Sequence, residues 1–257
     1  MQTNNRSIKT RQRDAISYIV IMALFSALAY ALTFFFSIKV SFLTFDVKDG
    51  LITVAAFLFG PISGVLISLL VATLELITVS ATGFYGFIMN FLSSATFSAV
   101  AGLLYSRRKS LNNALIALFV ALFSMVSIMM LANLYITPFY TGLDTEGIAN
   151  MIPTLLFPFN LAKGLVNAAI AMLLYKPIAT TIRRSGFMPK KRVKATPVQT
   201  MQEGAPVKDD GMQTKADATK ESFVFNKGTV LVLVIAVLTL VLAGVILYLL
   251  NAEFKVF

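Results

Sequence analysis

The chain has 257 residues, of which 57% are hydrophobic and 13% charged, and its mean hydropathy of +0.80 predicts an integral membrane protein, because soluble domains contain about 45–50% apolar residues. The absence of Cys and His excludes disulfides and Cys-based metal sites, and it removes the commonest metal ligand and the usual proton carrier near neutral pH. The net charge of +10 lies in short basic clusters beside apolar runs, which indicates membrane topology and no nucleic-acid partner.

The first predicted helix covers residues 15–37 and follows a basic segment, residues 1–14. A cleaved signal peptide is the alternative, but its apolar region is only about 7–15 residues long, and here apolar sequence resumes soon after the run. We therefore expect an uncleaved helix with a cytoplasmic N-terminus.

This helix carries small residues at a regular spacing. Ala23, Ala27 and Ala31 follow an i, i+4, i+8 pattern, which places them in one stripe. Small residues let another helix approach closely. The stripe therefore predicts either packing within this chain or docking of a second membrane protein.

The next apolar block, residues 50–79, is too long for one span. As a single helix it would measure roughly 45 Å, against a hydrocarbon core of about 30 Å. Gly60 and Pro61 lie inside it, and Pro disfavours a continuous helix. We predict a short second helix and a third helix from Pro61 to about Val79.

Three more helices are expected before residue 181, and charge supports the count. With the split at Gly60, the basic residues 107–109 and the basic segment after residue 175 fall on the same side as the basic N-terminus. The result is an all-α, six-helix membrane domain over residues 15–180. Its remaining helices are 84–105, 112–134 and 157–180, and its external loops are 38–49, 80–83 and 135–156.

The rest of the chain differs in composition. Residues 181–227 are basic and then polar, which predicts a disordered cytoplasmic linker. Residues 228–250 form an uninterrupted apolar run, long enough for one extra C-terminal transmembrane helix. Residues 251–257 would then be a short external tail.

Polar residues of the predicted helices gather in the external half of the membrane. Glu75, Asn90 and Asn133 lie near the external ends of three helices, and Asn160 and Lys163 lie on one face of the sixth. Charges and amides in lipid need partners, so we expect them to converge on each other or on a ligand.

Simpler explanations exist for several of these residues. Lys163 could extend to the interface, or Glu75 could be its partner. Asn167 is better explained as a packing contact between helices. The aromatic residues Phe45 and Tyr140 fit an interfacial belt, or a cover over a planar ligand.

Five segments resemble the substrate-binding S components of energy-coupling-factor vitamin transporters, and most closely the riboflavin-binding, RibU-type members. They are FDVKD (45–49), FGPISG (59–64), TGFYGFIMN (82–90), NLYITPFY (133–140) and PFNLAKG (158–164), and the resemblance covers about residues 14–180. It implies that Asn133, Asn160 and Lys163 contact a flavin near the external face. The linker and the seventh helix are not part of the usual S component.

The resemblance also implies the partners. The Ala stripe would contact a transmembrane coupling subunit, and two ATPase subunits would supply energy in a bacterial cell membrane. This fits the absence of a G-x-x-x-x-G-K-[ST] motif from the sequence. Riboflavin would be a transported ligand, with no cofactor, no metal and no catalytic residues. The predicted ligand contacts are Asn133, Asn160, Lys163, Asn90, Glu75, Phe45 and Tyr140.

Other functions stay open at this stage. Glu75 is unexpected in a riboflavin binder, which leaves folate, thiamine or another vitamin as the substrate of an S component. A stand-alone facilitator or ion-coupled carrier is a further alternative, although the sequence shows no inverted repeat or internal polar pathway. A membrane enzyme fits least, because no nucleophile or general base can be assigned.

Overall fold

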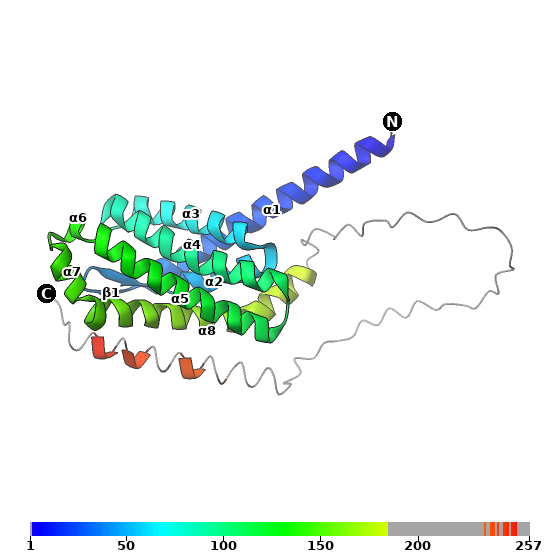
Figure 1. Ribbon diagram of the computed structural model, residues 1–257. Coiled ribbons are helices and arrows are strands. Elements are labelled where there is room, and N and C mark those ends of the chain that lie inside the picture. Colours follow the sequence, from blue (N-terminus) through cyan, green and yellow to red (C-terminus); the bar gives the residue numbers. More distant parts are fainter. Residues whose placement is uncertain are drawn as a thin grey trace.

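The computed structural model describes residues 2–184 and scattered positions between 234 and 250. Within this described part, five helical segments are long and apolar enough to cross a membrane, and a sixth, α2, is shorter. The predicted all-helical membrane fold is therefore confirmed. The long helices and α2 are α1 (Gln2–Phe35), α2 (Lys48–Phe59), α3 (Pro61–Thr78), α4 (Gly83–Arg107), α5 (Leu111–Ile136) and α8 (Phe157–Arg184), arranged as one bundle (Figure 1).

The first helix is longer than predicted. It begins at Gln2 instead of residue 15, and its N-terminal part projects away from the bundle (Figure 1). The membrane-spanning part is assigned to Ala15–Phe35, close to the predicted range. Hydropathy marks where a helix can enter lipid and not where it begins, so the polar first turns were missed.

The predicted break between the second and third helices is confirmed. α2 ends at Phe59, and α3 begins with Pro61 at its first position. Gly60 joins them with a φ of 103°, a conformation that a side chain disfavours. Its N–H donates to the Ala56 carbonyl at 2.9 Å, so the end of α2 is closed by a backbone hydrogen bond.

The predicted loop 38–49 contains a small antiparallel hairpin. β1 (Ile38–Val40) pairs with β2 (Leu43–Phe45), and Ser41 turns between them with a φ of 55°. Val40, Leu43 and Phe45 are buried. Two three-residue strands are too short for a sequence pattern to reveal them, because only their packing against the bundle stabilises them.

The predicted loop 135–156 is also structured. It holds α6 (Pro138–Thr141), α7 (Thr145–Asn150) and a π-helical turn, η1 (Ile152–Leu156), which leads into α8. Asp144 caps α7 by accepting the Gly147 N–H at 2.9 Å. These elements and the hairpin lie at the same end of the bundle, which we call the hairpin end (Figure 1).

α2 lies at the centre of the packing, with ten of its twelve residues buried. Gly50 allows the close approach of α8, since an added Cβ would lie 2.7 Å from the Ile170 side chain and 2.8 Å from the Asn167 carbonyl oxygen. Because α2 is enclosed on all sides, its polar side chains are buried in the interior as well. Two of those residues are charged, Lys48 and Asp49.

Candidate functional site

Lys48 is the central residue of the candidate site. It is 1% exposed and bonds two carboxylates, Glu75 at 2.6 Å and Asp46 at 3.2 Å. An ammonium group in the interior is tolerated only with such partners. Lys48 therefore joins the turn after the hairpin to α3.

Two further bonds extend this pair into a continuous polar chain. Lys163 donates to Asp46 Oδ2 at 2.9 Å, and the Asn90 amide donates to Glu75 Oε2 at 3.0 Å. The order Lys163–Asp46–Lys48–Glu75–Asn90 connects α8, the segment after β2, α2, α3 and α4. We call these five residues the buried polar chain.

The polar chain answers the question of the Lys163 partner. Lys163 is 4% exposed, so it does not extend to the interface. Its partner is Asp46, and the predicted alternative, a pair with Glu75, is wrong because Glu75 is held by Lys48. Sequence reasoning missed Asp46 and Lys48 because it placed them in an external loop. The available signal was charge alternation at i, i+2 in FDVKD, directly before an apolar helix.

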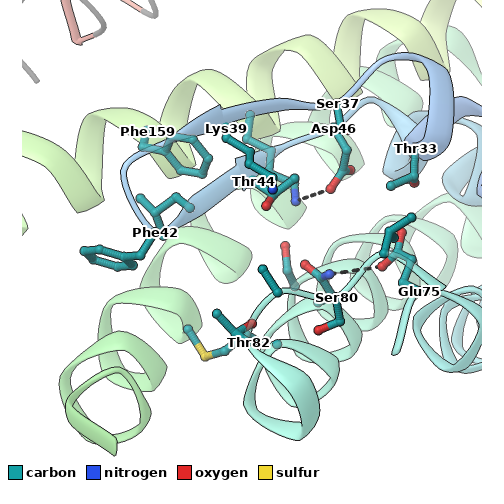
Figure 2. Close-up of a pocket in the computed structure, with 18 of the residues that line it drawn as sticks. Thr33, Ser37, Lys39, Phe42, Thr44, Asp46, Glu75, Ser80, Thr82 and Phe159 are labelled. Carbon is teal, nitrogen blue, oxygen red and sulfur yellow. Dashed lines mark hydrogen bonds and ion pairs between the residues drawn. The ribbon is translucent and has the colours of Figure 1, made fainter. Parts of the chain in front are cut away.

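A cavity of about 550 Å³ lies beside this chain at the hairpin end. Figure 2 shows Asp46 beside Thr44 on the hairpin side of the cavity, and Glu75 and Ser80 on the facing side. Its size is within the range of small-molecule sites. Its lining includes charged residues (Asp46, Glu75, Lys163), amides (Asn90, Asn160), hydroxyl groups (Thr33, Ser37, Ser80, Ser93) and apolar or aromatic residues (Met89, Met129, Tyr140, Phe159).

The cavity lining includes five of the seven predicted ligand contacts, namely Asn160, Lys163, Asn90, Glu75 and Tyr140. The other two, Asn133 and Phe45, are buried and are not among the lining residues.

Asn133 and Phe45 lie behind neighbours that do line the cavity. The Asn133 amide donates to the Met129 carbonyl at 2.7 Å, and its oxygen accepts from Thr137 at 3.0 Å. Phe45 packs edge-on against Phe159, with ring centroids 6.1 Å apart. Both side chains therefore support the cavity wall from behind.

Asn160 and Tyr140 are fixed at the wall by local contacts. The Asn160 amide donates to the Leu156 carbonyl at 2.8 Å, across the first turn of α8. The Tyr140 ring stacks on Tyr85 at 5.9 Å and meets Phe42 edge-on at 6.4 Å. A held side chain loses little conformational freedom when it binds a ligand.

Asn167 is a packing residue, as predicted. Its amide oxygen accepts the Gly50 N–H at 2.7 Å, and its amide nitrogen donates to the carbonyls of Asp46 at 3.1 Å and Lys163 at 2.9 Å. It thereby ties α8 to the start of α2 and positions the backbone on either side of the Lys163–Asp46 bond.

The electrostatics of the cavity wall centre on Asp46. Burial by itself raises the pKa of its carboxyl group, but the ammonium groups of Lys163 and Lys48 outweigh that effect and hold the pKa below its ordinary value. Asp46 is therefore ionised at neutral pH. Its Oδ1 and the Ser93 hydroxyl are among the described polar atoms that are buried without a hydrogen-bond partner.

The Ala stripe lies away from the cavity. Ala23 and Ala27 are exposed and Ala31 is half-buried, whereas Met22 and Phe25 on the neighbouring face are packed into the core. The exposed part of the stripe thus points away from the described bundle.

Comparisons with a family model, with characterised proteins and with solved structures agree with one another. A family model described as "ECF transporter, substrate-specific component" matches residues 17–179. The riboflavin transporter RibU of Staphylococcus aureus is 29% identical over 175 residues, which are 65% of this chain and 92% of that protein. A solved S component of a bacterial ECF transporter is similar with a TM-score of 0.56 and 25% identity, covering 68% of this chain and 99% of that one.

Proposed function

This chain belongs to the substrate-specific components of ECF transporters, which are membrane transport subunits and not enzymes, and from that premise we propose that it captures riboflavin or a close flavin for uptake. The observation that carries the proposal is the cavity at the hairpin end, where the Asn160 and Lys163 of the PFNLAKG segment share one wall. The similarity to the S. aureus riboflavin transporter supports the same ligand.

The lining suits the two chemically different parts of a flavin. A planar ring system needs apolar faces, which Met89, Met129 and Phe159 offer, and donors and acceptors at its edge. In this proposal the Asn160 amide pairs with the imide edge and the Lys163 ammonium gives a charge-assisted bond to a ring carbonyl or nitrogen.

The polyol chain of a flavin would face the acidic side of the cavity. Its hydroxyl groups are donors, and Asp46 Oδ1 is a buried acceptor without a partner in the described structure. Glu75 and Asn90 line the same cavity. Tyr140 would cover the ligand, while Asn133 and Phe45 would hold the lining in place. This gives Glu75 a role that is compatible with a riboflavin binder.

Substrate-specific components pair with an energy-coupling module. We propose that the exposed Ala stripe docks the transmembrane coupling subunit, because small side chains allow a close helix crossing. ATP hydrolysis would take place in two ATPase subunits. The basic clusters support a cytoplasmic N-terminus and linker, and in this proposal the hairpin end faces outward.

The test is ligand binding by the purified chain. Riboflavin fluorescence should be quenched on titration with the protein. In a competition assay, unlabelled riboflavin should displace bound, labelled riboflavin far better than thiamine or folate does. Displacement by thiamine or folate alone would assign the chain to a different vitamin.

Uptake by proteoliposomes separates the transport mechanisms. Riboflavin should accumulate only when the coupling module and ATP are present. Accumulation with this chain alone would contradict the proposal and favour a facilitator or an ion-coupled carrier.

A further inference from the structure

The C-terminal apolar segment carries one inward-facing stripe. Its described residues lie in a helix, Val237–Leu250. Leu250 is buried, and Thr239 and Ile246 are half-buried, whereas neighbours such as Val245 and Leu249 are 50% and 58% exposed. Positions separated by seven and four residues lie on one face of a helix. This face is therefore packed against protein, and the opposite face is not.

The stripe contacts the hairpin end of the bundle. Leu250, 5% exposed, belongs to a hydrophobic cluster built from the hairpin, α7, η1 and the start of α8, and Ile246 packs against the same cluster. In Figure 1 the described pieces of this helix, coloured orange to red, follow α8 and run in the opposite direction. The other members of this cluster are Val40, Leu43, Phe45, Ile148, Leu155, Leu156, Phe159, Ala162 and Val166.

The same cluster forms the back of the cavity wall. Leu43 and Phe159 belong both to the cluster and to the cavity lining. A segment that packs on the outer side of the cluster therefore stabilises the same wall that a ligand contacts from the cavity.

The elements that make this wall have little stability of their own. The two strands have three residues each, α7 has six, and η1 is a five-residue π-helical turn. Such short elements have little stability without tertiary packing. The cavity is partly open at this end, and movement of these elements changes how freely a ligand can leave it.

The C-terminal helix lies outside the family's shared region. The family match ends at residue 179, and the S. aureus relative is covered over 92% of its length by only 65% of this chain. The contact made by Leu250 and Ile246 is therefore an addition to the shared fold, placed on the end that is built from its shortest elements.

We propose that the C-terminal helix is an intramolecular brace, which docks on the cluster through Leu250 and Ile246 and slows the opening of the cavity wall. Docking of this helix does not depend on which ligand the cavity binds. Only the choice of riboflavin as the probe rests on the proposed function. The brace predicts slow ligand exchange and a more stable hairpin end.

Docking is tested by cysteine cross-linking, which the naturally Cys-free chain allows without background. Leu250→Cys combined with Val40→Cys joins two members of the cluster, and Leu249→Cys with Val40→Cys is the matched control from the exposed neighbour. A short bifunctional maleimide should cross-link the first pair within one chain more efficiently than the second, because Leu250 is buried in the same cluster as Val40 whereas Leu249 is exposed. Equal linkage of the two pairs, or linkage only between two chains, overturns the proposal.

The bracing effect is tested with Leu250→Ala and Leu249→Ala in the full-length protein. Loss of the buried side chain should speed dissociation of bound riboflavin about tenfold, equivalent to about 1.4 kcal/mol, and lower the thermal unfolding midpoint. Leu249→Ala should leave both unchanged. An unchanged dissociation rate in Leu250→Ala overturns the brace.

The failure of the proposed function is separable from the failure of the brace. If riboflavin does not bind to the unaltered protein, the cross-link and the unfolding midpoint still decide docking. In that case an unchanged midpoint in Leu250→Ala, together with equal linkage of the two cysteine pairs, overturns the brace.

Discussion

The two ends of the bundle are built from different chemistry, although the same helices run through both. At the hairpin end the interior holds the buried polar chain and a cavity of about 550 Å³. At the opposite end, Phe57 packs on Tyr105 and Tyr175, with ring centroids 4.4 and 5.8 Å away. The hydroxyl groups of these tyrosines share a hydrogen bond of 2.7 Å.

α2 shows the contrast within a single twelve-residue helix. Its first residues, Lys48 and Asp49, are buried among charges, and Phe57 near its end is buried among rings. Close aromatic packing fills space and stabilises the bundle. A buried ion pair adds little net stability compared with apolar packing, although removal of one partner is costly because the other charge stays buried and unpaired. Charged groups around a cavity also give a ligand something to bind. The comparison therefore separates an end that holds the bundle together from an end that recognises a ligand.

The largest expected effect is the loss of the central charge of the hairpin end. Lys48→Met leaves Asp46 with one ammonium partner and Glu75 with none, and breaking a buried ion pair costs about 3–5 kcal/mol. Thermal unfolding in detergent should show a large fall in the midpoint. Lys39→Met, at an exposed hairpin position, should change stability by less than about 0.5 kcal/mol. A midpoint that is the same in both variants would contradict the structural role of the polar chain.

Removal of a cavity amide should mainly change binding. Asn160→Ala should weaken riboflavin binding by about 1–3 kcal/mol, because a polar group of the ligand is left without a partner. Fluorescence titration measures the loss. Asn113→Ala, at the opposite end where that amide bonds the Leu104 and Arg108 carbonyls, should leave affinity unchanged. Equal affinity of the two variants would remove Asn160 from the site.

The aromatic end should respond in stability alone. Tyr175→Phe removes the hydroxyl that bonds Tyr105 and keeps the ring against Phe57, so we expect a loss of about 0.5–1.5 kcal/mol. Riboflavin affinity should not change. If affinity falls together with stability, the two ends are energetically coupled and do not have separate roles.

The smallest effect is expected from mild acid. Since the pKa of Asp46 is held below its ordinary value of 3.8, its ionised form stabilises the fold at higher pH, and this contribution is lost only as the pH falls through the lowered value. Asp46 should therefore cause no change in the unfolding midpoint between about pH 8 and pH 5. The difference between the unaltered protein and Asp46→Asn should be constant over that range and shrink below it. A difference that shrinks already near pH 6 would show that this pKa is not lowered.

The sequence by itself determined the helices of the membrane domain and the place of the break between the second and third. Apolar runs of spanning length and the Gly60–Pro61 step are local signals, and α3 begins at Pro61 as expected. Depth along the helices also predicted that Asn90, Asn160, Lys163 and Glu75 share one end, and all four line one cavity. Asn133, at a similar depth, does not line it, because depth does not specify the direction of a side chain.

Only the tertiary structure decided how the charges are paired. Asp46 and Lys163 are 117 residues apart in the chain, and their contact depends on the hairpin folding back over α8 and on Gly50 letting α2 approach that helix. No local sequence pattern specifies a contact between residues so far apart in the chain. The FDVKD segment contains the charges, but its position outside the predicted spans suggested solvent. The bundle encloses it, and burial turned three charges of an apparent loop into members of the interior.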